Sequence, residues 1–176
     1  MPQQDESTEG RVRGEYTIRP IGYVSCSHVD QDKTPIQPVY GEGCRARVTI
    51  LPEYEEGLDD LEGFSHIFIL FMFHKAGPPT LKVKPYLENT KRGVFATRSP
   101  RRPNPVGLSL VRLVRRERNV LFIEDEDILD GSPVVDIKPF IARFDSRSDV
   151  RSGWQDSISE SDAREVGMRS KKEPGK

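Results

Sequence analysis

The residues best suited to chemistry lie in a basic, proline-rich stretch, residues 93–107, with the sequence GVFATRSPRRPNPVG. Arg98, Arg101 and Arg102 fall within five residues there, and three prolines fix φ and restrict the residue before each of them. A stiff loop loses little entropy when its guanidinium groups hold an anion. The segment therefore predicts an anion-binding loop, and a solvated connection between two strands is the alternative.

Two aspartates in a second short segment offer acid–base chemistry. Asp127 and Asp130 precede Gly131 and Ser132 in the string DILDGSP. A carboxylate in such a corner can hold a ribose diol or accept a proton. The alternative is a simple acidic turn in which Asp130 bonds to its own backbone, and the residue types alone leave both interpretations open.

Two histidines share one face of a strongly apolar stretch, residues 64–74. His66 and His74 are eight residues apart, about 27 Å at the rise of an extended strand, so they cannot share a ligand. His66 lies inside the apolar run, and we expect a core histidine there. His74 lies at the end of the run beside Lys75 and is the better candidate for a site.

Several common kinds of site lack support. The two cysteines, Cys26 and Cys44, form no CxxC pair and no Cys/His cluster with metal spacing, which argues against both zinc and a disulfide framework. There is no GxSxG, no GxxxxGK[ST] and no GxGxxG after a strand. No apolar run has the length of a membrane span, and the N-terminus lacks a signal-peptide pattern. We expect a cytoplasmic protein without a metal and without membrane contact.

The charge is close to balanced overall and uneven along the chain. The net charge is −1, yet residues 82–118 hold eleven Lys or Arg and two Glu, a local balance of +9. Residues 53–62 hold six acidic residues and no basic one. This asymmetry predicts a surface with one basic face, which is either a footprint for RNA or a solvated edge.

The elements that must position these residues are mostly short strands. Residues 53–61 predict one or two acidic helical turns, and Pro139 places the last strand near an edge. The strands are predicted at residues 16–26, 46–51, 64–74, 93–97, 107–115, 119–126 and 134–141. Many short strands with little helix predict a mainly β fold, a small closed or partly open barrel or a sandwich, with short helical turns.

Composition divides the chain into three parts. Residues 1–13 are polar and predict a flexible arm, whereas residues 14–144 carry the predicted strands and form the expected barrel domain. Residues 145–176 contain seven acidic and seven basic residues and predict a polar, partly disordered tail. Trp154 is the exception in this tail, and we expect it to pin one turn to the body.

The order of five motifs resembles the TsaA-like family of tRNA methyltransferases. The resemblance covers roughly residues 16–144. The motifs are RPIGYV at residues 19–24, PIQ at 35–37, GFSH at 63–66 leading to FHK at 73–75, GVFATRS at 93–99 with RPNPVG at 102–107, and DGSPVVDIKP at 130–139.

The resemblance implies a fold, a reaction and a cofactor. Members are small β-barrel methyltransferases without a Rossmann fold that act as homodimers. They use S-adenosylmethionine to methylate N6 of threonylcarbamoyladenosine at position 37 of tRNA, beside the anticodon. By position, the implied cofactor site consists of Pro35, Ile36, Gln37, His74, Lys75, Arg98, Leu108, Asp127, Ile128, Leu129, Asp130, Gly131 and Ser132.

Roles within that site follow from side-chain chemistry. Arg98 is expected to pair with the cofactor carboxylate through a bidentate fork. Asp130 or His74 is expected to accept the proton that the attacking amine loses. The phosphates of the anticodon loop are expected to be held by Lys91, Arg92, Arg101 and Arg102. The alternative function is a non-catalytic β-barrel module that binds RNA or a nucleotide.

Overall fold

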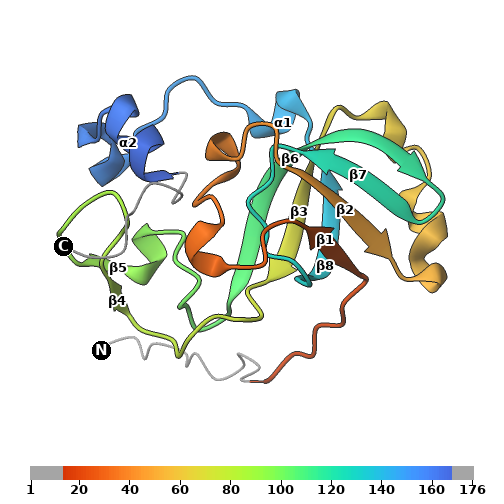
Figure 1. Ribbon diagram of the computed structural model, residues 1–176, viewed down its shortest axis with the longest axis horizontal. Coiled ribbons are helices and arrows are strands. Elements are labelled where there is room, and N and C mark those ends of the chain that lie inside the picture. Colours follow the sequence, from red (N-terminus) through yellow and green to blue (C-terminus); the bar gives the residue numbers. More distant parts are fainter. Residues whose placement is uncertain (1–13, 168–176) are drawn as a thin grey trace, which may run out of the picture.

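A closed barrel of six antiparallel strands forms the centre of the computed structural model, which describes residues 14–167. Around the barrel the strands follow the order β1-β2-β7-β6-β3-β8 (Figure 1). They are β1 (Gly22–Cys26), β2 (Arg45–Ile50), β3 (His66–Met72), β6 (Val106–Glu117), β7 (Val120–Glu124) and β8 (Pro133–Pro139). Closure pairs every barrel strand on both sides, which confirms the predicted barrel and removes the sandwich alternative.

The alternation within β3 shows how the sequence builds the wall. Ile67, Ile69 and Phe71 point into the barrel and are at most 2% exposed. His66 belongs to the opposite face and is exposed, because successive side chains of a strand point to opposite sides. The expectation of a core histidine at this position is therefore wrong.

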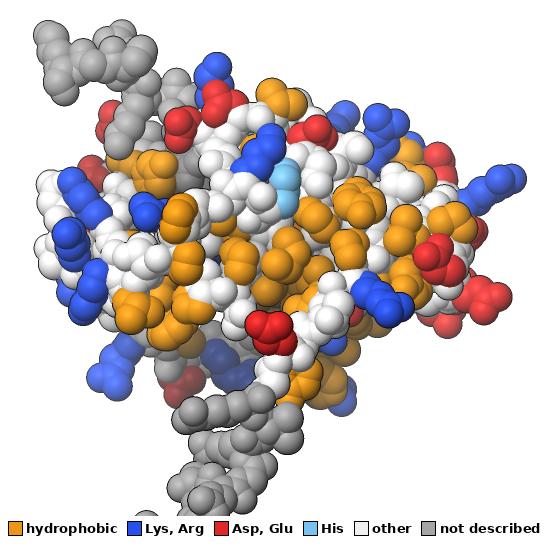
Figure 2. Space-filling model, turned by 90° about the horizontal axis from the view of Figure 1, so that it is seen from below, with side chains coloured by type: hydrophobic (Ala, Val, Ile, Leu, Met, Phe, Trp, Pro, Cys, Tyr) orange, Lys and Arg blue, Asp and Glu red, His pale blue; other side chains and the backbone are white. Residues whose placement is uncertain are grey.

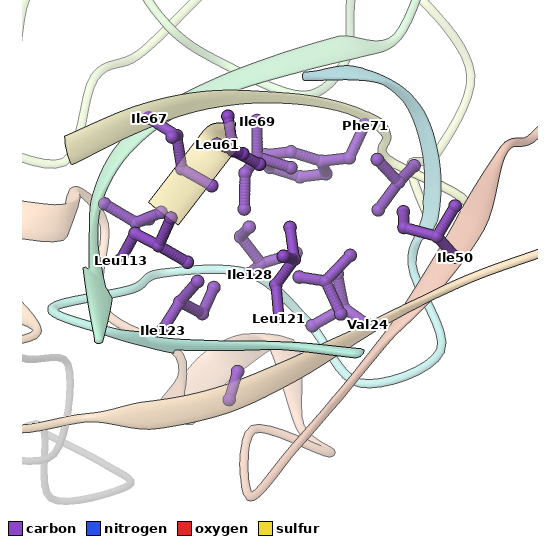
Figure 3. Packing of buried hydrophobic residues seen from close by; sticks show 14 of the residues in the cluster. Val24, Ile50, Leu61, Ile67, Ile69, Phe71, Leu113, Leu121, Ile123 and Ile128 are labelled. Carbon is purple, nitrogen blue, oxygen red and sulfur yellow. The ribbon is translucent and has the colours of Figure 1, made fainter. Parts of the chain in front are cut away.

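The connection between β7 and β8 fills the middle of the barrel. Ile128 in this connection is completely buried, and Figure 3 shows its side chain between those of opposite walls, such as Ile69 and Leu121. Glu126, two residues earlier, is also fully buried. The chain thus runs inward at Glu126, Ile128 and Leu129, so the predicted acidic segment is anchored in the hydrophobic core.

Gly107 in β6 is required by close packing inside the barrel. A Cβ at this position would lie 2.4 Å from Cζ of Phe71, far inside van der Waals contact. The aromatic ring occupies the space that any other residue would need. The glycine is therefore needed for this close approach and not for a positive φ.

Short elements surround the barrel. The two-stranded sheet consists of β4 (Lys82–Val83) and β5 (Arg92–Gly93). The helical elements are η1 (Gln31–Lys33), η2 (Pro38–Tyr40), η3 (Pro52–Leu58), η4 (Leu61–Gly63), η5 (Val94–Ala96), η6 (Gly153–Ser157), α1 (Ala142–Asp145) and α2 (Glu160–Gly167). The acidic turns predicted at residues 53–61 are confirmed as η3 and the start of η4.

The strand prediction is wrong in three details, the first of which is that residues 16–21 precede β1 and form no strand. Residues 93–97 do not form a strand, because Val94 starts a 3-10 turn that Thr97 closes with both its backbone N–H and its hydroxyl on the carbonyl of Val94. Pro139 does not mark a sheet edge, since the barrel has none. It is the last residue of β8 and lies opposite Ile67.

The C-terminal segment returns to the body of the protein. Trp154 contacts the body, as expected, because its indole N–H donates to the carbonyl of Ala96 at 2.8 Å. The predicted arm at residues 1–13 and the last part of the predicted tail, residues 168–176, lie outside the described residues. None of the helices in residues 14–167 combines the length and the apolar character that a membrane span requires.

Candidate functional site

A wide groove runs along the outer face of β6 and has a volume of about 1090 Å³. Leu108 and Leu110 form its floor, and they are exposed because they alternate with buried residues of the same strand. Three loops and the C-terminal segment form its walls. The lining residues from these walls include Ile36, Gln37, Tyr40, Lys84, Tyr86, Thr97, Arg98, Ser99, Trp154 and Arg164.

Arg98 and Gln37 meet in this groove from two loops that are distant in sequence. Nη1 of Arg98 donates a hydrogen bond to Oε1 of Gln37. The η5 turn ends at Thr97 and directs the next residue into the groove, while Gln37 precedes Pro38 at the start of η2. The structure thus brings together Ile36, Gln37, Arg98 and Leu108, four of the predicted cofactor-site residues.

The positive charge of Arg98 is close enough to the carboxyl group of Asp127 to affect its pKa. Burial, together with the neighbouring charge of Glu126, raises the pKa of Asp127 from 3.8 to about 6. The hydroxyl of Ser109, which donates to Oδ1 of Asp127 at 2.5 Å, and the charge of Arg98 both lower this pKa. Asp127 is therefore a carboxyl group that titrates near neutral pH.

His74 lies beside Ser132, where the connection between β7 and β8 ends. Nδ1 of His74 is 3.3 Å from the hydroxyl oxygen of Ser132. Burial and the charge of Lys75 lower the pKa of His74, so this imidazole is neutral at neutral pH. The carbonyl of Lys75 accepts a hydrogen bond from Gln31 at 3.0 Å, which joins the early loop to this corner.

Asp130 faces a different part of the surface from Arg98. Its Oδ1 accepts a hydrogen bond from the backbone N–H of Cys26 at 3.0 Å. The side chain lines a separate depression of about 310 Å³ over β1 and β2, whereas Arg98 lines the groove on β6. Within one subunit the structure places Arg98 and Asp130 in no common cavity among those described.

Three other residues of the predicted set are buried supports. Pro35 is buried just before the Ile36–Gln37 wall of the groove. Ile128 and Leu129 are at most 9% exposed and belong to the core rather than to a surface site. Their burial fixes the backbone between Asp127 and Asp130 and turns the two carboxylates to different sides.

The predicted phosphate-binding residues surround the loop that carries Arg98, and three of them also have partners within the protein. Arg92 pairs with Glu88 through two hydrogen bonds, and Nε of Arg101 donates to the carbonyl of Pro78 at 3.1 Å. Arg102 donates to the carbonyls of Thr97 and Ser99, while Lys91 is exposed. Figure 2 shows Lys and Arg side chains gathered along one margin of a face whose middle is hydrophobic.

Sequence reasoning missed a set of aromatic groups around the groove. Tyr40, Tyr86, Phe140 and Trp154 all line it, and they come from four separate segments of the chain. No spacing in the sequence links these residues, because each reaches the groove only through the packing of its own loop. The resulting walls can stack against a planar ring.

A second feature that the sequence did not reveal is a buried charged pair. Nε2 of His28 lies 3.1 Å from Oε1 of Glu126, and Glu126 is fully buried. The close approach of this carboxylate raises the pKa of His28 above its ordinary value. Among the described residues no group of three or more His, Cys, Asp or Glu side chains is arranged to hold a metal ion.

Comparisons with known proteins agree with the resemblance seen in the motifs. The family described as "tRNA-methyltransferase O N-terminal domain" matches residues 23–146. A protein of Pyrococcus abyssi named as a probable S-adenosyl-L-methionine-binding protein is 48% identical over 136 residues, which cover 77% of this chain and 74% of that protein. The human tRNA (adenine(37)-N6)-methyltransferase is 42% identical over 144 residues, which cover 78% of this chain and 33% of that protein.

Solved structures give the same answer for the fold. A crystal structure of TrmO superposes with a TM-score of 0.69 at 39% identity and covers 80% of this chain. The match covers 64% of the TrmO chain, so this chain spans less than two thirds of that protein and about one third of the human relative. From its family match, its level of identity and its shared barrel, this chain belongs to the tRNA-methyltransferase O N-terminal domain family.

Proposed function

We propose that this protein is a methyltransferase that transfers a methyl group from S-adenosylmethionine to N6 of adenosine 37 in tRNA, where that base carries a threonylcarbamoyl group. The observation that carries the proposal is the pairing of Arg98 with Gln37 across the groove in a member of this family. Relatives are named as S-adenosyl-L-methionine-binding proteins and as tRNA (adenine(37)-N6)-methyltransferases, which supports both the cofactor and the acceptor.

The residues present in the groove fit S-adenosylmethionine. The guanidinium of Arg98 uses one donor on Gln37 and has further N–H groups that can form a bidentate pair with a carboxylate. Leu108 is 53% exposed on the floor and offers an apolar surface for an adenine ring. When bound, this cofactor supplies a methyl group that is already activated for transfer.

The groove is also large enough for a second group beside the cofactor. Ligand pockets usually occupy roughly 300–1,000 Å³. At about 1090 Å³, the groove can take a cofactor together with an unstacked base. Recognition of single-stranded RNA commonly uses aromatic side chains on which bases stack, and Tyr86 and Trp154 supply such surfaces here.

The protein must accept a proton from the attacking N6 amine, and two groups are suited to this. His74 is neutral at neutral pH because its pKa is lowered, so it can act as a base. Asp127 has a pKa of about 6, so it is mostly ionised at neutral pH, and it lies in the field of Arg98; neither Asp127 nor His74 is among the residues that line the groove. Asp130 is less suited, because the backbone of Cys26 already engages its Oδ1.

Binding of the anticodon loop is assigned to the basic residues beside the groove. Lys91 is exposed, and within residues 14–167 the side chain of Arg101 donates through Nε, which leaves its two terminal amino groups for phosphate oxygens. Phosphate contacts of this kind position an RNA and make its binding salt-dependent. The proposal places the protein in the cytoplasm, with tRNA as its macromolecular substrate.

A homodimer completes the proposal. Val114 lies on the outward face of β6 beyond the part of the strand that lines the groove, and it is 47% exposed. An exposed apolar side chain on a barrel wall is suited to burial against the same face of a second copy. Sedimentation equilibrium of the parent protein and of Val114→Glu tests this, with the expected result that the variant is monomeric at concentrations where the parent is dimeric.

Calorimetry with S-adenosylmethionine and a methylation assay test the enzymatic proposal. We expect saturable cofactor binding, and Arg98→Ala should raise the Kd about tenfold to hundredfold, since a hydrogen-bonded charge is lost. Arg101→Ala is the matched control from the same loop: it should leave cofactor binding unchanged, while it weakens RNA binding and reduces its salt dependence.

The outcomes separate the two candidate functions. Mass spectrometry of nucleosides from tRNA that already carries threonylcarbamoyladenosine should show a methyl group added to that nucleoside by the parent protein. If RNA binds well while the cofactor does not, the protein is a binding module and the enzymatic proposal is wrong. If methylation occurs on a different nucleoside, only the acceptor is wrong.

A further inference from the structure

The C-terminal segment, residues 152–167, contacts both loops that carry the Arg98–Gln37 pair. Figure 1 shows the blue part of the chain leaving the barrel at α1 and reaching α2 on the side where β4 and β5 lie. On this path its residues form one wall of the groove, with Ser152, Trp154, Gln155 and Arg164 lining it. This wall comes from residues that follow β8, the last described strand of the barrel, and that are not part of the barrel sheet.

The first contact holds the arginine loop. The indole N–H of Trp154 donates to the carbonyl of Ala96 at 2.8 Å. Ala96 is the last residue of η5 and lies two positions before Arg98. A shift of this carbonyl therefore moves the guanidinium that reaches Gln37.

The second contact holds the glutamine loop. The backbone N–H of Ile36 donates to the carbonyl of Gly167 at 3.0 Å, one position before Gln37. Gly167 also lies against the ring of Tyr40, so closely that a Cβ on it would be 2.5 Å from Cγ of that ring. The end of α2 thus fits against the loop from Ile36 to Tyr40 and requires a residue without a side chain.

The charges on α2 also act on this loop. Burial raises the pKa of Tyr40, the nearby charge of Glu160 raises it further, and Arg164 lowers it. Glu160 and Arg164 pair with each other at 3.1 Å on the helix. Ala163, on the buried side of α2, is 6% exposed, so the helix is packed onto the body by an apolar contact as well.

We propose that residues 152–167 hold the two groove loops at the separation at which Arg98 and Gln37 meet, and that Trp154 and Gly167 are positioning residues for ligand binding. The two loops are 61 residues apart at the paired side chains, and the direct link between those side chains is a single hydrogen bond. The C-terminal segment forms a hydrogen bond with each loop, at Ala96 two residues before Arg98 and at Ile36 one residue before Gln37. Because a bidentate pair needs its fork in one orientation, loss of either fastening weakens anion binding in the groove.

This inference rests on the proposed function for its ligand, and its structural part can be tested without one. Three variants are compared with the parent: Trp154→Phe, which keeps an aromatic ring and loses the indole N–H; Gly167→Ala, which displaces the ring of Tyr40; and Glu165→Gln, a matched control on the exposed side of α2. The readouts are amide hydrogen exchange, calorimetry with S-adenosylmethionine and the thermal midpoint.

Exchange of the Ile36 and Thr97 amides in the ligand-free protein should become about tenfold faster in Trp154→Phe and in Gly167→Ala, since those amides report on the two fastened loops. The Kd for S-adenosylmethionine should rise about fivefold to tenfold in both, as expected for one lost hydrogen bond. Glu165→Gln should match the parent, and the thermal midpoint should stay close to that of the parent in all three, because the barrel does not depend on this segment.

The inference is overturned if exchange and Kd are unchanged in both loop-contact variants, or if Glu165→Gln has the same effect as they do. If Trp154→Phe unfolds, Gly167→Ala alone decides. If the parent itself does not bind S-adenosylmethionine, the proposed function is wrong, and the exchange rates still decide whether the C-terminal segment positions the two loops.

Discussion

The buried carboxyl of Asp127 makes a prediction about stability that can be worked out from the structure. The change is Asp127→Asn, which has nearly the same shape and can still accept the hydrogen bond from the hydroxyl of Ser109. It removes the ability to ionise and replaces one carboxyl oxygen with an amide NH2 group, a change whose effect does not depend on pH. Any pH dependence that disappears in the variant therefore belongs to this one carboxyl group.

The sign and the size follow from the pKa values. Burial raises the pKa of Asp127 from 3.8 in an exposed setting to about 6 in the folded protein. Between these values the unfolded chain has released the proton and the folded one keeps it, so the free energy of unfolding falls as pH rises. A difference of about two pH units at about 1.4 kcal/mol each gives a loss of about 3 kcal/mol, complete a little above pH 6.

The assay is urea unfolding of the parent and of Asp127→Asn at intervals from pH 4 to pH 7.5. We expect the difference in free energy of unfolding, variant minus parent, to grow by up to about 3 kcal/mol over this range in favour of the variant. The exposed residue Asp149 supplies the control, and Asp149→Asn should show no such trend. A difference that stays flat, or that grows in favour of the parent, would refute the reasoning that burial dominates this site.

Two further predictions concern packing and the buried pair. Gly107→Ala should lower the free energy of unfolding by about 1–3 kcal/mol, because its Cβ would overlap the ring of Phe71, and urea unfolding should show no comparable loss for Gly57→Ala, whose Cβ meets no atom within 4 Å. His28→Gln should cost more stability at pH 6 than at pH 9. Glu126 raises the pKa of His28 in the folded protein, so the stabilisation is complete below the ordinary pKa and is lost as pH rises through the raised one. Unfolding midpoints at the two pH values would contradict this if the gap between variant and parent widened with pH.

The strands were predictable because their signal is local. In β3 and β6 buried and exposed side chains alternate along the chain, and this period of two residues can be recognised in the sequence. The failure at residues 93–97 has the opposite cause. The apolar run there is short, and the fold of η5 depends on the contacts of Val94 and Thr97 rather than on a period.

The prediction of His66 as a core residue failed for a related reason. A strand with apolar residues on both faces does not reveal which face is buried. Barrel closure places Ile67, Ile69 and Phe71 in the interior. The outer face of the same strand then borders the groove, where His66 lies. Only the curvature of the complete sheet makes this choice.

The residue types of the site could be predicted from the sequence, but their arrangement in space could not. The arginine string and the order of the motifs led to the family, which the comparisons confirm. Which aspartate accompanies Arg98 depends on the burial of Ile128 and Leu129, which turns Asp127 and Asp130 to different sides. Two carboxylates three residues apart look equivalent in a sequence and are distinguished only by the packing between them.

Residue types and their spacing along the chain were enough to predict the β-rich character of this protein, the stiffness and charge of its arginine loop, and its family. Three features follow only from the folded chain: the barrel closes, Gln37 meets Arg98, and Trp154 and Gly167 lie against the loops of the groove. These contacts join residues tens of positions apart. They form only when a common core brings the segments together, and no local preference encodes that distance.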